Sequence, residues 1–266
     1  MAAKKSERID IFTDCLKVEK IMLQNTKFPE YVTRITEDST FSFSCHKGVT
    51  CFTECCRLLE LALTPYDVLR LRRGTGIHSG KLLENYIILE HKPGEPFPRF
   101  YLTMVDDGRA SCVFVDKAGC SIYDHRPGAC RTYPLGRAAI SETNNVIEEH
   151  YVLMREPHCR GFAEKEEQNI VKYSRDQGLE EYNRFNDEVA SILQHNAIRN
   201  GFIPSKKQAN LYTLALYNID TFREKLLSDK IASVRLEVSE KKILQDDEQL
   251  LLFAIKWLYK ELYSAI

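Results

Sequence analysis

The sequence lacks the features of two large classes of protein, membrane-embedded and secreted. No apolar run approaches the roughly 18 residues that a membrane-spanning helix needs, and the longest late run covers only residues 250–255. The first ten residues carry positive charge, but no apolar segment follows them as it would in a secretory signal. We therefore expect a cytoplasmic protein that does not bind a membrane.

The chain also lacks an excess of either charge. It has 37 Lys and Arg against 38 Asp and Glu, and its formal net charge is −1. The balance holds along the chain, with 21 basic and 21 acidic residues up to Cys159 and 16 and 17 after it. A nucleic-acid partner needs a basic surface to displace counterions from phosphates, so we expect none.

Cysteine is absent from the last 107 residues but abundant before them. With 44% hydrophobic residues, a chain of 266 residues can bury a core without cross-links. In a reducing compartment, clustered cysteines are more often metal ligands or catalytic thiols than disulfides. The ninth cysteine, Cys15, falls in the apolar set of an amphipathic helix predicted over residues 9–30, so we expect a buried thiol there. The other eight are Cys45, Cys51, Cys55, Cys56, Cys112, Cys120, Cys130 and Cys159.

The pattern of the first 163 residues favours short strands. A helix is predicted to begin at Thr64 and Pro65, with Asp67 complementing its dipole, and to end near Gly74–Gly76. A second helix start lies at Ser79. Runs with β character, separated by turn residues, predict a small antiparallel sheet. These runs are residues 86–90, 99–105 and 112–115, with a strand entering the first cysteines at 41–45 and an edge strand at 146–154.

From residue 164 onward, apolar spacings of three and four predict helices. The helical segments are 164–178, 179–199, 206–228 and 241–263. The expected fold is α+β, a small cysteine-rich metal-binding domain with a short antiparallel sheet followed by a mainly helical C-terminal domain. The predicted division is an N-terminal helix and linker at 1–40, the metal-binding domain at 41–163 and the helical domain at 164–266.

The eight clustered thiols could form two sets of four. Four thiolates are the usual complement of a structural zinc ion or an iron–sulfur cluster, so the count does not choose between them. Adjacent side chains diverge along most backbone conformations, so Cys55 and Cys56 are expected either to face two neighbouring sites or to supply one ligand between them. A strained vicinal disulfide is the remaining alternative.

The spacings exclude three common motifs. They do not match the Cys-x2-Cys-x2-Cys-x3-Cys-Pro run of bacterial ferredoxins, and position 58 lacks the third cysteine of a radical-SAM triad. The paired Cys-x2-Cys knuckles of a zinc ribbon are absent as well. The actual order is Cys45-x5-Cys51-x3-Cys55-Cys56, then Cys112-x7-Cys120-x9-Cys130, then Cys159.

Four segments of the sequence resemble the YkgJ-type cysteine-cluster family, and residues 120–134 are the most specific of them. The other three are Cys51-x3-Cys55-Cys56, residues 63–71 and Cys112–Val115. That family is described as a zinc- or iron-chelating CxxCxxCC domain and as an iron–sulfur-cluster-containing protein, and flagellin lysine-N-methylase FliB is a relative. The resemblance covers about residues 41–195 and implies no established reaction. The five residues between Cys45 and Cys51 depart from the compact CxxC, so Cys45 is one of the eight predicted metal ligands on the count of clustered thiols and not on the resemblance. The resemblance implies metal binding by Cys51, Cys55, Cys56, Cys112, Cys120, Cys130 and Cys159.

Other polar residues lie close to these cysteines in sequence. Arg126 and Arg131 bracket Pro127, and either could offset the charge of a thiolate-rich centre or donate an N–H to sulfur. A structural bond from Arg126 to a loop carbonyl is the alternative. Three histidines could each replace a thiolate or lie on the surface, and two tyrosines are expected to pack over the site. These are His46, His125, His158, Tyr123 and Tyr133.

Three functions therefore remain open. The first is a cytoplasmic iron–sulfur protein with one or two Cys-ligated clusters, most simply of the 4Fe–4S type, in a redox or cluster-dependent role. The second is a structural zinc module whose metal only folds the domain. The third is a SAM-dependent protein-lysine N-methyltransferase similar to FliB. A protein partner, if one binds, is expected at the C-terminal helices.

Overall fold

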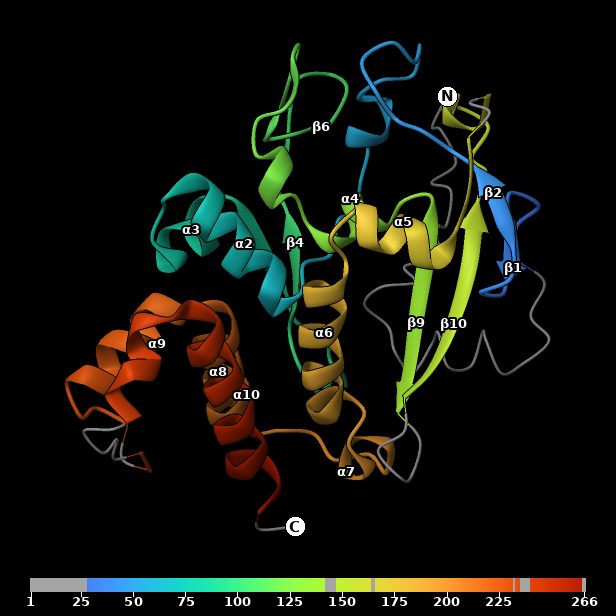
Figure 1. Cartoon of the computed structure of the whole chain (residues 1–266). Helices are drawn as coiled ribbons and strands as arrows, with labels where there is room; N and C mark the ends of the chain where they lie inside the picture. Colours follow the sequence, from blue (N-terminus) through green and yellow to red (C-terminus); the bar gives the residue numbers. More distant parts are fainter. Residues whose placement is uncertain (1–27, 142–146, 164–165, 232, 235–239, 265–266) are drawn as a thin grey trace.

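The structure, a computed structural model, describes residues 28–141, 147–163, 166–231, 233–234 and 240–264. Cys15 and nearly all of the helix predicted over 9–30 lie outside these residues. Within the described part of the chain, no helix is long and apolar enough to cross a membrane. Short antiparallel strands occupy the first half and helices the second, so the predicted α+β class is confirmed (Figure 1).

The strands pair into small antiparallel sheets. The largest has the order β1–β10–β9, formed by Val32–Ile35, Ile147–Met154 and Leu135–Ser141. The remaining sheets have two strands each. They pair β11 (Glu167–Asn169) with β2 (Thr40–Ser42), β3 (Ile87–Glu90) with β4 (Arg99–Leu102), β5 (Met104–Val105) with β6 (Ser111–Cys112), and β7 (Val115–Asp116) with β8 (Gly119–Cys120).

The observed pairing differs from the single sheet expected for residues 86–115. The run 112–115 is split between two hairpins, because the carbonyl of Phe114 accepts from the N–H of Ser121 at 2.8 Å and turns the chain there. The segment 146–154, expected at an edge, forms the central strand β10. Its two sides pair with β1 and β9, as in Val32 opposite Met154 and Ile147 opposite Ser141.

Helix α2 (Pro65–Thr75) begins and ends as its sequence predicts. The Thr64 hydroxyl accepts from the N–H of Asp67, and the Asp67 carboxylate accepts in return from the N–H of Thr64. This capping box satisfies two of the N–H groups that a helix start leaves unpaired. At the other end Gly76 adopts φ 70°, a left-handed conformation that suits glycine. A second helix, α3 (Ser79–Asn85), follows at once.

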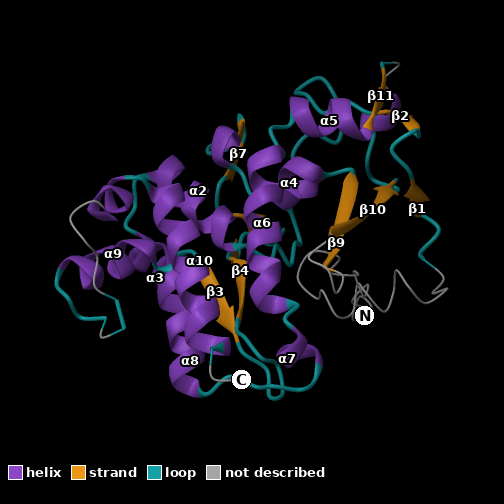
Figure 2. Cartoon of the chain, turned by 60° about the horizontal axis from the view of Figure 1, so that its bottom comes forward, coloured by secondary structure: helices purple, strands orange, loops and turns teal. Residues whose placement is uncertain are grey.

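The second half of the chain is mainly helical, as expected, but the start of the helix predicted over 164–178 is wrong, because Glu167–Asn169 pair with β2 as strand β11. Gly178 (φ 62°) and Gly201 (φ 89°) fall at the predicted breaks between helices. In both ribbon views α6 lies between α10 on one side and β9 on the other (Figures 1 and 2). The elements are α5 (Ile170–Asp176), α6 (Glu180–Leu193), α7 (Asn196–Arg199), α8 (Lys206–Tyr212), the π-helical turn η4 (Thr213–Tyr217), α9 (Ile219–Leu227), the 3-10 helix η5 (Glu240–Gln245) and α10 (Asp247–Tyr263).

The main hydrophobic core joins both halves of the chain. Tyr66 of α2 stacks on Phe185 of α6 at 4.3 Å between ring centroids, and Phe100 of β4 stacks on Tyr217 of η4 at 3.6 Å. All four rings are at least 95% buried and belong to one cluster. Helix α2 and strand β4 therefore pack against the C-terminal elements α6 and η4. The division of the chain at residues 40 and 163 stays a prediction.

An ion-pair network, here the arginine–aspartate network, reinforces the same contact. The Arg72 guanidinium lies 2.9 Å from the carboxylate of Asp220 and 2.9 Å from that of Asp247, and Arg73 is 3.4 Å from Asp247. Arg223 pairs with both aspartates. The side chains of the two aspartates are 7% and 14% exposed, so solvent screens these pairs less than it would at the surface. The network ties α2 to α9 and α10.

Candidate metal centre

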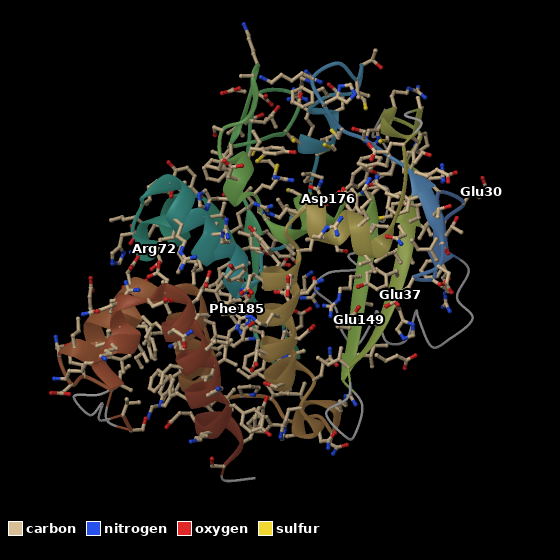
Figure 3. The ribbon with its side chains drawn as sticks, in the orientation of Figure 1. Glu30, Glu37, Arg72, Glu149, Asp176 and Phe185 are labelled. Atoms are coloured by element: carbon tan, nitrogen blue, oxygen red, sulfur yellow. The ribbon has the colours of Figure 1, made fainter. Side chains whose placement is uncertain are left out.

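The eight clustered cysteines come from separate segments that meet at one end of the molecule. In Figure 3, yellow sulfur atoms gather in the upper part of the view, on the blue and green segments away from α10. Cys45 and Cys130 are exposed, and the other six are partly buried. All eight are free thiols, and among the described residues no three Cys, His, Asp or Glu side chains already stand in a metal-binding arrangement. The vicinal disulfide is therefore not formed in this structure.

The first thiol group consists of Cys45, Cys51 and Cys159. The N–H of Ser44 donates to the carbonyl of Gly161 at 3.0 Å, which sets the chain before Cys45 beside the chain after Cys159. A Cβ at Gly161 would lie 2.7 Å from the Phe43 ring and 2.8 Å from the Ser44 carbonyl oxygen, so this approach requires glycine.

Hydrogen bonding and charge link the members of the first thiol group. The backbone N–H of Arg160 donates to Cys51 Sγ at 3.1 Å. Desolvation, together with thiolate charge on Cys55, Cys51 and Cys159, raises the pKa of Cys45 to about 11. The pKa of Cys159 is raised as well, chiefly by desolvation and in part by Cys51. These thiols are close enough for each to feel the charge of its neighbours.

The second thiol group consists of Cys112, Cys120 and Cys130. Cys112 lies opposite Met104 in one hairpin, Cys120 lies opposite Val115 in the next, and Cys130 belongs to the short helix α4 (Gly128–Thr132). Desolvation is the first cause of a raised pKa at all three thiols. At Cys130 the charges of Cys112, Cys55 and Cys120 add to it, although solvent reaches its side chain.

Asp67 holds α4 in place. Its buried carboxylate accepts from the N–H of Gly128 at 2.7 Å, in addition to the bonds from Thr64 within the capping box. Burial raises the pKa of Asp67, while these hydrogen bonds oppose the rise. The sequence predicts Asp67 as a residue at the start of a helix. Nothing in the sequence indicates its hydrogen bond with the N–H of Gly128, 61 positions away.

Cys55 lies within electrostatic reach of both thiol groups, and Cys56 is its neighbour. They end the 3-10 turn η1 (Glu54–Cys56), and their Sγ atoms are 4.0 Å apart. Thiolate charge on Cys55 raises the pKa of Cys45 in the first group and of Cys120 and Cys130 in the second. The thiol of Cys55 is therefore close enough to affect the pKa values of thiols in both groups.

The hairpin formed by β5 and β6 (residues 104–112) holds the η1 turn in position. Glu54 pairs with Arg109 at 2.7 Å, and the N–H of Leu58 donates to the carbonyl of Ala110 at 2.9 Å. Thr53 and Leu58 adopt positive φ angles of 69° and 54°, which cost energy for residues with a Cβ. Strained backbone on both sides of the two adjacent cysteines shows that the surrounding contacts, not local preference, fix this turn.

Arg126 and Arg131 have different surroundings. The positive charge of Arg126 lowers the pKa of Cys45 and of Cys120, while its guanidinium donates to the Tyr123 carbonyl at 2.7 Å and to Gln177 at 2.6 Å. Arg131 donates to the carbonyl of Arg126 at 3.2 Å and to that of Gln177 at 2.7 Å. Arg126 thus combines the electrostatic and structural roles considered for it, whereas Arg131 ties the loop at Arg126 to the end of α5 and lies over the Tyr182 ring of α6, at 5.0 Å from its centroid.

The histidines near the cysteines have other contacts. His125 packs against α2, where a Cβ at Gly74 would lie 2.7 Å from its own Cβ. His46 accepts from the N–H of Gly48 at 3.1 Å, and His158 lies 3.8 Å from Glu156.

The tyrosines differ in position. The Tyr133 hydroxyl is buried without a partner of regular geometry, and its pKa is raised by desolvation and by the nearby Cys159 and Glu156. Tyr123 is 53% exposed. Only Tyr133 therefore covers the thiols as expected. Glu156 and the Arg160 N–H are neighbours of the site that the sequence analysis did not single out.

Residues 44–160 match the family model CxxCxxCC, described as a "putative zinc- or iron-chelating domain". This segment is therefore similar to that family, and residues 44–160 are called the CxxCxxCC domain below. The match contains all eight clustered cysteines of the CxxCxxCC domain, Cys45 included. No curated protein and no solved structure matches the chain. The relation to YkgJ and FliB stays a prediction.

The donor set of the CxxCxxCC domain suits the metals that its family description gives. Thiolate sulfur is the usual ligand of structural zinc and of iron–sulfur clusters. The raised pKa values mean that several thiols hold their protons at neutral pH until a metal displaces them. Metal binding by this domain therefore releases protons and becomes weaker as the pH falls.

Proposed function

We propose that the CxxCxxCC domain holds two neighbouring iron–sulfur centres, each with four cysteine ligands, and acts in the cytoplasm as an electron-carrying or cluster-dependent protein. The first thiol group supplies three ligands of one centre and the second supplies three of the other. Cys55 and Cys56 each complete one set. The reach of Cys55 to thiols of both groups, with the Sγ atom of Cys56 4.0 Å from its own, carries the proposal.

The surroundings of the thiols support a redox role. Hydrogen bonds to sulfur, nearby charge and solvent exposure set the reduction potential of an iron–sulfur cluster. The Arg160 N–H bonds to Cys51, and the charge of Arg126 acts on one thiol of each group, Cys45 and Cys120. A bound cluster would supply one-electron chemistry. The residues of the chain bind it, offset its negative charge and limit its contact with water.

Metal analysis of the anaerobically purified protein tests this proposal. We expect brown protein with about eight iron and eight acid-labile sulfide ions per chain, and an EPR signal after reduction. Colourless protein with about two zinc ions and no sulfide would overturn the iron–sulfur assignment. Iron without sulfide would overturn it as well.

Cysteine variants test the division into two groups. Cys51→Ser and Cys130→Ser are each expected to lose about half of the iron, because each removes one ligand from a different centre. Cys15→Ser changes the ninth cysteine, outside both groups, and serves as the matched control with full iron content. Loss of all iron in both variants would show that the eight thiols form a single interdependent site.

The two alternatives make different predictions. A structural zinc module would unfold when a chelator removes its metal and would show no redox activity. A methyltransferase similar to FliB would bind SAM, which calorimetry detects as heat on titration. Absence of heat would remove that alternative.

A further inference from the structure

Tyr133 connects the two thiol groups. Its backbone follows directly after α4, the helix that carries Cys130 of the second group. Its ring packs against the same small hydrophobic cluster as Cys159 of the first group. Tyr133 therefore neighbours the second group along the chain and the first group through its side chain.

Contacts with other aromatic residues fix the Tyr133 ring. The ring meets that of Phe43 edge-on, at 5.9 Å between centroids, and the Tyr173 hydroxyl donates to the Tyr133 carbonyl. The Phe43 ring also lies against Gly161, two residues after Cys159. Phe43 is therefore a shared contact of Tyr133 and of the chain that follows Cys159.

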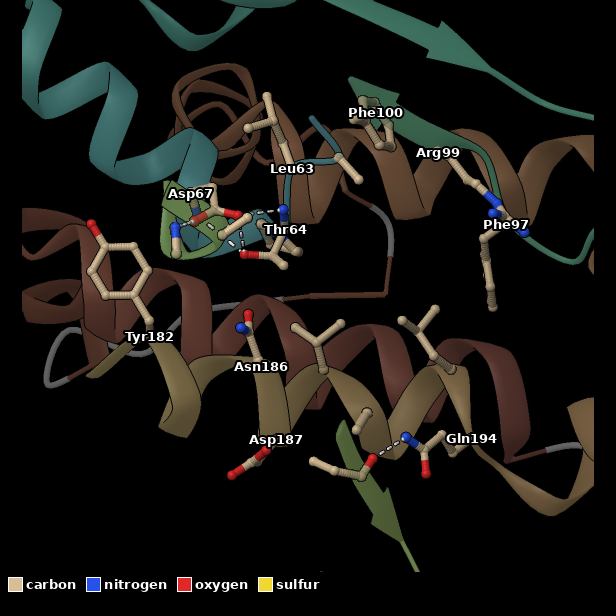
Figure 4. Close-up of a pocket in the computed structure, with 18 of the residues that line it drawn as sticks. Leu63, Thr64, Asp67, Phe97, Arg99, Phe100, Tyr182, Asn186, Asp187 and Gln194 are labelled. Atoms are coloured by element: carbon tan, nitrogen blue, oxygen red, sulfur yellow. Dashed lines mark hydrogen bonds between the residues drawn. The ribbon is translucent and has the colours of Figure 1, made fainter. Parts of the chain in front are cut away.

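Helix α4 has a second support that does not involve Tyr133. The Asp67 carboxylate accepts from the N–H of Gly128, and Figure 4 shows this carboxylate beside Thr64 in the wall of a pocket of about 220 Å³. Among the residues that the structure describes, the wall of this pocket includes neither Tyr133 nor a cysteine. Removal of the Tyr133 hydroxyl should therefore leave α4 and the pocket in place.

The Tyr133 hydroxyl is closed to solvent and has no hydrogen-bond partner of regular geometry in the described part of the chain. Burial raises its pKa, and two acceptors beside it, the Cys159 sulfur and the Glu156 carboxylate, raise the pKa further. The pKa of Cys159, which desolvation raises most, is lowered in return by the Tyr133 hydroxyl as a donor. A buried hydroxyl without an acceptor costs free energy, which a strong acceptor at this position would recover.

Metal binding changes one of these two acceptors. A neutral thiol accepts hydrogen bonds weakly, whereas a thiolate accepts a charge-assisted bond of about twice the usual strength. The Glu156 side chain is 21% exposed, so water already supplies its carboxylate with donors. Loss of the Cys159 proton to a metal therefore gives the buried Tyr133 hydroxyl the strong acceptor that the free thiol does not provide.

We propose that Tyr133 is a positioning residue of the metal centre, whose hydroxyl donates a hydrogen bond to the sulfur of metal-bound Cys159. The inference rests on the proposed binding of metal by Cys159, but not on the choice of iron over zinc. The bond offsets charge on one thiolate of the first group and holds that sulfur in its ligating orientation.

Zinc competition with a chelator on the reduced, metal-free full chain is the first test. Tyr133→Phe removes only the hydroxyl and should weaken zinc binding at one site about tenfold, as expected when a group that bonds to a ligand is lost. The matched control Tyr263→Phe removes another buried hydroxyl, which donates to the Ile192 carbonyl at 2.8 Å, and should bind zinc like the wild type. Wild-type zinc affinity in a folded Tyr133→Phe protein would overturn the proposal. Zinc in place of iron and sulfide in the purified protein would overturn only the iron–sulfur assignment.

The properties of the loaded centres separate the hydrogen bond from a packing effect. A hydrogen bond to sulfur stabilises the more negative, reduced cluster, so Tyr133→Phe should make one centre about tenfold harder to reduce, a fall of about 59 mV for one electron. In a protein that holds zinc, cobalt(II) serves as the probe, and loss of the bond should move the thiolate-to-cobalt absorption to longer wavelength. An unchanged potential, or an unchanged cobalt absorption, would assign the hydroxyl to Glu156 and contradict the proposal.

Discussion

Replacing Asp67 by alanine tests how α2 positions the cysteine-bearing helix α4. The change removes the acceptor for the Gly128 N–H, which is buried and has its bond of 2.7 Å to this carboxylate. An unpaired buried N–H costs about 1–3 kcal/mol. The return half of the capping box, the bond from the Thr64 N–H to this carboxylate, is lost at the same time and costs about 1 kcal/mol, while the Thr64 hydroxyl still accepts from the N–H of residue 67. We expect the free energy of unfolding to fall by about 2–4 kcal/mol.

A second cap provides the control. Asp246 caps α10 by accepting from the N–H groups of Glu248 and Gln249, all in an exposed setting. Asp246→Ala should therefore cost only about 1 kcal/mol. Urea unfolding of the metal-free proteins gives both values, and metal analysis of the loaded proteins should show that only Asp67→Ala loses the second centre. Equal losses of stability in the two variants, with full metal content, would refute the reasoning.

The pH dependence of this effect has a definite sign. Burial raises the pKa of Asp67 above 3.8, so between that value and its raised pKa the folded protein binds more protons than the unfolded chain. The contribution of Asp67 to stability therefore falls as the pH rises through this window. The loss caused by Asp67→Ala is expected to be larger at the acid end of the window than at neutral pH, and a constant loss would contradict the raised pKa.

Three further predictions concern other contacts. Gly161→Ala places a Cβ 2.8 Å from the Ser44 carbonyl oxygen, so the free energy of unfolding, measured with urea, should fall by about 1–3 kcal/mol. The same variant should lose the first centre, which iron analysis would show. Asp247→Ala leaves Arg72 and Arg223 to share the carboxylate of Asp220, with positive charge in excess, so we expect a loss of about 2–3 kcal/mol that high salt partly restores. A loss independent of salt would exclude charge repulsion. The metal-free protein should lose stability as the pH rises from 9.0 to about 11, because the pKa of the Cys45 thiol is higher in the folded state than in the unfolded chain. Unchanged urea midpoints across this pH range would contradict the raised pKa.

The parts of the fold that depend on neighbouring residues could be predicted from the sequence. The start of α2 at Thr64 and Pro65 and its end at Gly76 rest on local hydrogen bonds and local backbone preference, so the sequence contains them. The helices after residue 164 follow from apolar spacing. The central place of β10 could not be predicted, because it depends on pairing with Val32–Ile35, more than 100 residues earlier, and with the alanine-rich strand Leu135–Ser141.

The candidate site shows the same limit. Count and spacing singled out eight thiols, all of which lie in the matched CxxCxxCC domain. Their sorting into two groups depends on contacts between distant segments, such as the approach of Gly161 to Ser44. The role of Asp67 in holding Gly128 could not be inferred either, because one carboxylate serves both a local cap and a remote helix.

The core shared by both halves of the chain also sets the order of events during synthesis. Phe185 and Tyr217, which cover Tyr66 and Phe100, leave the ribosome after all eight clustered cysteines. At 5–20 residues per second, the last 107 residues take about 5–20 s to make. During that interval α2 and β4 lack the aromatic side chains that cover Tyr66 and Phe100 in the folded chain. The main core is therefore completed only after every cysteine-bearing segment has been made.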